Sequence, residues 1–330
     1  MRPAILLLTA SVLAAGPGKK DAVKMPDSAR KATSRALAWL AARQNGDGSW
    51  SEARYPHNPA ITSFALLAFL SQGHLPNQGI YGKEIARGVR YLVSSQREDD
   101  GYIIGTRGGN MYSHGMAALV LAEVYGLTND KTIRPALKKA VELIVGGQNR
   151  DGGWRYTPQP RDADVSVTIM QVMALRAAKN AGLHVKDETM RDAIDYIKRC
   201  YDDRSGGFCY MPGMRPGFAR TAAGVCVLQL TGEYKASEIP RAVDYLKDNF
   251  DAREHYWYGH YYASHAMHQV GGREWKAWYE RMLESFLPMQ SADGSWSGYE
   301  QRGSPGPVYQ TAIAVIALSV PMNYLPIYQR

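Results

Sequence analysis

The chain has 330 residues, 45% of them hydrophobic, and a formal net charge of +8 at pH 7. The hydrophobic share is ordinary for a globular protein, and no apolar run approaches the roughly 20 residues that a transmembrane helix needs. The positive charge suits anionic partners or an anionic membrane surface. Lysines and arginines are spread along the chain without a long cluster, so the sequence gives little support to nucleic-acid binding.

The N-terminus has the pattern of a short secretory signal peptide. Arg2 precedes an apolar run from Ala4 to Ala15, which ends in small residues as a cleavage site would. The alternative is a frayed and weakly apolar start without a targeting role. We predict a cleaved signal peptide over 1–15, a polar linker over 16–26, one domain over 27–330, and a periplasmic or secreted location.

From residue 27 onward, two kinds of helix alternate along the chain. Asp27 or Ser28 can cap the first helix, which carries one apolar stripe. The next helix, over 59–70, is apolar almost all round, which is typical of a helix buried on all faces. The later pairs, striped helix first, are expected over 83–95 and 111–125, 131–145 and 165–178, 187–200 and 218–230, 239–250 and 256–270, and 274–289 and 308–320.

A short loop motif recurs between the two helices of a pair. Close copies cover 44–50, 148–154 and 290–296, and weaker copies place Tyr102 or Phe208 where the others have tryptophan. The glutamines at 44, 96 and 148 are 52 residues apart, and a fixed period of that size indicates an array of one supersecondary unit. Glycine supplies the positive φ of the turn, and aspartate accepts hydrogen bonds from its backbone. We expect the aromatic side chain to cover the junction between hairpins and the glutamine to join the loop to the next helix.

The motif Gln-x-x-x-Gly-x-Trp resembles the QW repeat of the terpenoid cyclases, such as squalene-hopene cyclase. Related glycine-rich repeats occur in the β subunits of protein prenyltransferases. The resemblance spans roughly 27–324 and is far more specific for fold than for activity. It implies an all-α protein, a single α/α toroid of six helical hairpins, whose apolar helices form an inner barrel and whose striped helices form an outer one. Closure into a ring buries the apolar face that no hairpin can bury alone.

In such a barrel, the first turns of the inner helices gather at one end and surround a central cavity, where the positive ends of the helix dipoles also point. These first turns supply the candidate residues. Those with a candidate catalytic role are Asp162, Asp164, His114 and His260. Those with a candidate ligand-binding role are Tyr112, Arg220, Tyr258, Tyr262 and Tyr309. For the histidines, the alternative is a hydrogen-bonded structural role.

The strongest local signal is Asp162-Ala163-Asp164-Val165. In the protonating cyclases, the middle aspartate of an Asp-x-Asp-Asp motif donates the initiating proton. By this resemblance Asp162 matches the first aspartate and Asp164 the proton donor, whereas Val165 stands in place of the last. That departure removes part of the carboxylate network that assists such an acid. The alternative is that Asp164 caps the backbone N–H groups of a helix.

The sequence predicts neither a metal nor a cofactor. The prenyltransferase zinc set implied by the resemblance has a cysteine shortly after an aspartate, but here Ser166 stands at that place after Asp164. The Asp-Asp-x-x-Asp motif is missing as well. If the protein is exported, Cys200 and Cys209 can pair across a loop, and three packed thiols are an equal alternative.

The sequence is compatible with two functions. The chain has 21 tyrosines against 6 phenylalanines. Aromatic faces stabilise cations, but phenols and histidines at a rim also quench them. The polar rim and the incomplete aspartate motif therefore favour a non-catalytic protein that binds an amphipathic, lipid-like or peptide-like ligand. Its partners would be a small hydrophobic or amphipathic molecule, or a peptide or protein, and peripheral membrane association stays open. The alternative is an acid-initiated isoprenoid cyclase or isomerase with Asp164 as its general acid.

Overall fold

The computed structural model describes residues 23–105, 108–298 and 305–329. The predicted signal peptide over 1–15 and most of the linker lie outside these residues. Within the described residues, no helix is long and apolar enough to cross a membrane.

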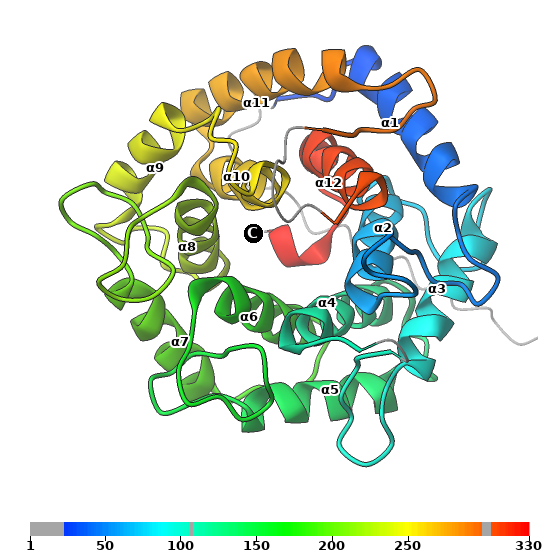
Figure 1. Ribbon diagram of the computed structural model, residues 1–330, viewed down its shortest axis with the longest axis horizontal. Helices are drawn as coiled ribbons and strands as arrows, with labels where there is room; N and C mark the ends of the chain where they lie inside the picture. Colours follow the sequence, from blue (N-terminus) through cyan, green and yellow to red (C-terminus); the bar gives the residue numbers. More distant parts are fainter. Residues whose placement is uncertain (1–22, 106–107, 299–304, 330) are drawn as a thin grey trace, which may run out of the picture.

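Across the described ranges, twelve α-helices form six hairpins arranged as a ring (Figure 1). The outer helices are α1 (Asp27–Ala41), α3 (Gly82–Ser94), α5 (Arg134–Gly146), α7 (Asp187–Arg199), α9 (Ile239–Asp248) and α11 (Gly272–Phe286). The inner helices are α2 (Pro59–Ser71), α4 (Met111–Thr128), α6 (Val165–Asn180), α8 (Phe218–Leu230), α10 (Tyr256–Val270) and α12 (Pro307–Ser319). Each inner helix contacts the next one, and α12 contacts α2. The predicted all-α toroid of six hairpins is therefore confirmed.

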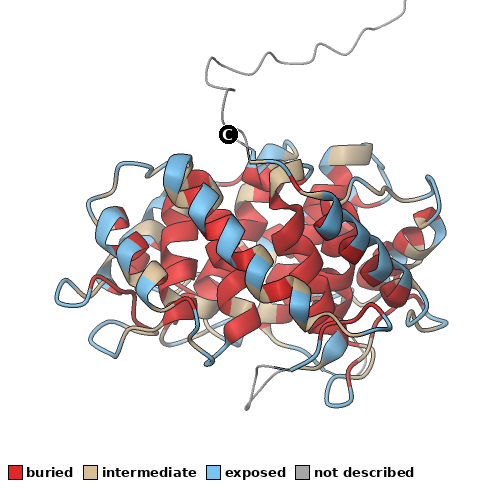
Figure 2. Ribbon diagram, turned by 90° about the horizontal axis from the view of Figure 1, so that it is seen from above, coloured by how far each residue is buried: buried red, intermediate tan, exposed pale blue. Residues whose placement is uncertain are grey.

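The two layers differ in burial as their sequences predict. Every residue of α2 is buried, whereas α7 buries only Thr189, Ala193, Tyr196 and Ile197. Figure 2 shows buried residues through the interior of the molecule and exposed ones on the outer helices and loops. The predicted start of α1 was wrong in one detail. Pro26 occupies the N-cap without a side-chain hydrogen bond, and Asp27 lies in the first turn, where its charge still faces the positive end of the helix dipole.

The recurrent loops join neighbouring hairpins through one set of hydrogen bonds. Trp154 is fully buried, and its indole N–H donates to the Ile144 carbonyl at 2.7 Å. The Gln148 amide donates to the carbonyl of Gly152 in its own loop and to that of Thr189 in α7. Gly152 has φ +86°, and a Cβ there would lie 2.3 Å from the Asp192 carbonyl oxygen. Only glycine therefore permits this close approach of loop and helix.

The segment after α12 closes one end of the barrel. It contains two short 3-10 helices, η2 (Val320–Met322) and η3 (Pro326–Tyr328). η3 packs against α4 and α6, and the red C-terminal segment lies near the middle of the ring (Figure 1). Leu325, Ile327 and Tyr328 are buried there. None of the helices predicted from the sequence covers this segment.

Candidate functional site

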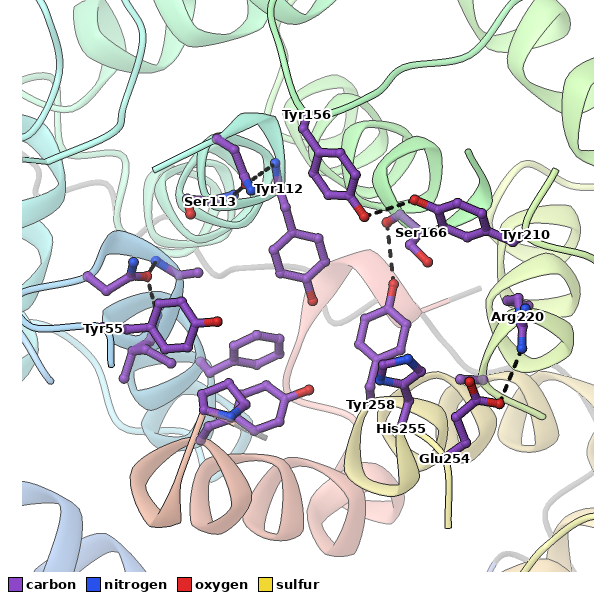
Figure 3. A pocket seen from close by; sticks show the side chains of 18 residues that line it. Tyr55, Tyr112, Ser113, Tyr156, Ser166, Tyr210, Arg220, Glu254, His255 and Tyr258 are labelled. Atoms are coloured by element: carbon purple, nitrogen blue, oxygen red, sulfur yellow. Dashed lines mark hydrogen bonds and ion pairs between the residues drawn. The ribbon is translucent and has the colours of Figure 1, made fainter. Parts of the chain in front are cut away.

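A cavity of about 570 Å³ opens at the end of the barrel where the inner helices begin. All six inner helices or the residues just before them contribute to its wall. Much of this wall is phenolic (Figure 3), with Tyr55, Tyr112, Tyr156, Tyr210, Tyr258 and Tyr309 among the lining residues. Parallel inner helices bring these residues together from distant parts of the sequence, as the toroid requires.

The cavity is polar at its mouth and apolar at its base. The side chains of Tyr55 and Tyr156 at the mouth are 42% and 41% exposed. Buried lining residues include Ile61, Phe64 and Tyr309, and the rings of the last two meet edge to face at 5.0 Å between centroids. A molecule in this cavity would thus find aromatic and aliphatic surface inside and hydrogen-bonding groups outside.

The charges in the wall largely offset one another. Arg220, in the first turn of α8, lies 3.4 Å from a carboxylate oxygen of Glu254, and Figure 3 shows this pair at one side of the cavity. Among the described lining residues, Arg220 is the only lysine or arginine. Because Glu254 pairs with it, the described wall offers no unpaired guanidinium or ammonium group to a phosphate.

Asp164 lies behind the cavity wall, where it caps α6. Its Oδ1 accepts the backbone N–H of Val167 at 2.8 Å, and its Oδ2 accepts the Tyr210 hydroxyl at 2.9 Å. Arg155 Nε is 3.5 Å from the same Oδ2. Burial raises the pKa of Asp164, and the hydrogen bonds from Val167 and Tyr210 and the charge of Arg155 oppose that rise. Asp164 thus caps the helix and is also hydrogen-bonded to Tyr210, a side chain of the cavity wall.

A chain of hydroxyl groups connects Asp164 to the cavity. Tyr156 and Tyr210 both line it, and their hydroxyl oxygens are 2.9 Å apart. Since the Tyr210 hydroxyl donates to Asp164, Tyr156 is the donor in the bond between the two phenols. Asp162 instead pairs with Arg155, which also approaches Asp164. Asp164 therefore does not line the cavity. It is connected to the cavity by its hydrogen bond with Tyr210.

His114 and His260 lie within the barrel wall and do not line the cavity. His114 Nδ1 accepts the backbone N–H of Ile103, and its Nε2 donates to the Ala140 carbonyl, both at 3.0 Å. His260 Nε2 donates to the Phe250 carbonyl at 3.1 Å. Burial lowers the pKa of His114 to about 4 and that of His260 to about 3, so both rings are neutral near pH 7. These contacts correspond to the structural alternative for the histidines.

The structure brings together most of the predicted ligand-binding residues. Tyr112, Arg220, Tyr258 and Tyr309 line the cavity. Tyr262 is buried one helical turn below Tyr258, with ring centroids 4.9 Å apart. Sequence reasoning missed three lining tyrosines, Tyr55, Tyr156 and Tyr210, which precede the inner helices. The signal for them was a tyrosine in the loop that leads into an inner helix, four residues before α2, nine before α6 and eight before α8.

Neither a disulfide nor a metal site appears among the described residues. Cys200, Cys209 and Cys226 are buried free thiols. The Cys209 backbone N–H donates to the Cys200 carbonyl at 2.8 Å, so the backbone itself joins the two ends of that loop. No group of three or more His, Cys, Asp or Glu side chains in the described ranges could hold a metal ion.

Family comparisons agree with this architecture. Residues 161–326 match the prenyltransferase alpha-alpha toroid domain, and residues 31–210 match a domain of unknown function, DUF6288. The chain belongs to the superfamily of α/α toroids that contains the terpenoid cyclases and prenyltransferases. A drimenyl diphosphate synthase from Streptomyces showdoensis is 42% identical over 76 residues. That match spans 23% of this chain and only 14% of the relative.

Solved structures with a similar fold include a mannanase and a terpene cyclase. One is an inactive variant of the alpha-1,6-mannanase GH76A of Salegentibacter sp. HEL1_6 with alpha-1,6-mannotriose, with a TM-score of 0.69 and 9% identity, covering 90% of this chain and 99% of that one. The other is a variant of the type II terpene cyclase MstE from Scytonema with geranylgeranyl dihydroxybenzoate, with a TM-score of 0.66 and 13% identity, covering 91% and 99%. At such identities the likeness concerns the fold alone.

Proposed function

We propose that this protein is an exported, non-catalytic toroid that binds an amphipathic ligand in its central cavity. The single observation that supports it best is the change from a polar mouth to an apolar base. The apolar part of the ligand would contact Ile61, Phe64 and Tyr309, and its polar part would lie near Tyr55 and Tyr156. The apolar leader in the sequence supports export.

The polar part of this ligand is expected to be uncharged. A diphosphate buried near the wall would need cations or free backbone N–H groups to replace its hydration. Arg220 is already paired with Glu254, and side chains bond the first-turn N–H groups of α2, α4, α6 and α12. Only α8 and α10, among the described inner helices, begin without a side-chain cap. Tyrosine, serine and amide groups are better suited to hydroxyl-bearing or amide-bearing head groups.

A titration with alkyl maltosides tests this proposal. Ser166 lies in the first turn of α6 and lines the cavity, so Ser166→Trp would fill the site without removing a core side chain. We expect isothermal titration calorimetry to show binding to the wild type and at least about tenfold weaker binding to Ser166→Trp, or about 1.4 kcal/mol. Ser237→Trp, at an exposed position before α9, is the control and should bind as the wild type does. Equal affinity in all three proteins, or no binding to any, would contradict the proposal.

The second candidate function is an acid-initiated isoprenoid cyclase, and the hydroxyl chain from the cavity to Asp164 favours it. Asp164→Asn keeps the shape of the side chain but cannot act as a general acid. For the proposed binding protein, we expect no cyclised product when squalene is incubated with the wild type, by gas chromatography with mass spectrometry. Product from the wild type that disappears in Asp164→Asn and persists in Asp195→Asn, which changes an exposed residue of α7 in the same way, would instead establish the enzyme.

A further inference from the structure

An aromatic column runs from the cavity to the opposite end of the barrel. Phe64 lines the cavity, and its ring meets that of Tyr261 edge to face at 5.4 Å between centroids. The Tyr328 hydroxyl donates to the Tyr261 hydroxyl at 3.0 Å. Tyr328 in turn stacks on His265, with centroids 3.4 Å apart and planes 5° apart. The column below Phe64 therefore includes Tyr328, a residue of the C-terminal segment.

Helices on two sides of the barrel hold this segment in place. The Ile327 backbone N–H donates to Glu123 Oε2 of α4 at 3.4 Å, and the Gln269 amide of α10 donates to the Tyr328 carbonyl. His265 lies in the same helix as Gln269 and is buried, and burial lowers its pKa well below its ordinary value. A neutral imidazole is consequently available for stacking, and no charge lies beneath the Tyr328 ring.

We propose that Tyr328 determines how long the apolar part of the ligand can be. It acts through Tyr261, as a positioning residue, because its ring blocks the space into which Tyr261 would otherwise move. With the Tyr261 ring held against that of Phe64, the cavity has a fixed base. The inference rests on the proposed binding function and adds the element that limits ligand length.

The experiment measures how affinity depends on alkyl chain length. Alkyl maltosides from octyl to hexadecyl are titrated into the full-length wild type and two variants. In the wild type, affinity should rise about fourfold for each methylene that enters the cavity and then level off when the chain reaches the base. Tyr328→Ala should move this plateau to a chain longer by about two methylenes, since a tyrosine ring is far larger than two such groups. Tyr328→Phe keeps the ring, loses only the hydroxyl, and should keep the wild-type plateau.

The possible outcomes separate this inference from the function on which it rests. If the wild type binds no maltoside of any length, the proposed function fails and the inference falls with it. If the wild type binds and folded Tyr328→Ala has an unmoved plateau, only the inference is overturned. If Tyr328→Ala does not fold, Tyr261→Ala removes the supported ring itself, and an unmoved plateau there also overturns the inference. A plateau displaced equally in Tyr328→Phe would show that the hydroxyl pair, and not the ring, sets the depth.

Discussion

Replacing Trp154 with alanine is expected to lower the free energy of unfolding by about 3–5 kcal/mol, the usual range when a large buried aromatic is truncated. Trp154 is fully buried, its indole N–H is bonded to the Ile144 carbonyl, and its backbone N–H is bonded to Thr168. The truncation would leave a cavity between helices and remove one of the two hydrogen bonds to the Ile144 carbonyl, which also accepts the Gly147 backbone N–H at 3.2 Å. A urea titration measures the change, and a midpoint equal to that of the wild type would show that the junction does not depend on this ring.

Two controls separate the ring from the loop. Trp154→Phe keeps most of the apolar surface but cannot donate to the Ile144 carbonyl. Its loss in free energy of unfolding should therefore be clearly smaller than that of Trp154→Ala. Arg150→Ala changes an exposed residue of the same loop and should stay within about 0.5 kcal/mol of the wild type. If Arg150→Ala costs as much as Trp154→Ala, the effect belongs to the loop as a whole.

Glu123→Gln should make the stability of the protein depend less on pH. Glu123 is 2% exposed, and burial raises its pKa from 4.5 to about 8. Between these values the folded protein keeps the proton and the unfolded chain loses it. The Glu123 contribution to stability is therefore complete below the ordinary pKa and is lost as the pH rises toward 8, at up to about 1.4 kcal/mol per pH unit. Glutamine does not titrate. The free energy of unfolding of Glu123→Gln, relative to that of the wild type, should therefore rise steadily from about pH 5 to about pH 8.

The measurement is the free energy of unfolding by urea at several pH values in this window. Tyr261 interacts electrostatically with both Glu123 and Cys226. Burial raises the pKa of Tyr261 and that of Cys226, so neither titrates in the window. Glu52 is also buried and burial raises its pKa, but it caps α12 at the other end of the barrel. Its contribution is therefore the same in the wild type and in Glu123→Gln, and it cancels from their difference. Parallel pH profiles for the wild type and Glu123→Gln would show that Glu123 is ionised in the folded protein.

The fold could be predicted from sequence because its determinants are local and repeated. The predicted bounds of α8, 218–230, agree with the structure, since burial on all faces ends where the apolar run ends. The Tyr/His-rich segment predicted over 256–270 also has the bounds of α10. The loop glycines, with Gly152 as an example, mark turns that other residues cannot make. No periodic pattern in the sequence predicts η3, because the segment is short and its contact with the barrel depends on distant residues such as Glu123.

The site could be predicted only to the level of the first helical turn. Tyr112, Tyr258 and Tyr309 were found because parallel inner helices place their first turns at one end. His114 and His260 share those turns but lie inside the wall. The direction of a side chain depends on how each helix is rotated about its axis, and packing between hairpins determines that rotation. The spacing of residues along the sequence does not specify this rotation.

The joint between the last hairpin and the first is built like the other joints. The Gln290 amide donates to the carbonyl of Ala32 in α1, across 258 positions of sequence, as Gln148 does to Thr189 across 41. An open array of repeats exposes two terminal faces, from which it can fray one unit at a time. A closed ring has no such faces, so opening any one joint strains its neighbours. The long separation across the final joint also raises the contact order, so ring closure is the step that loop entropy slows most during folding.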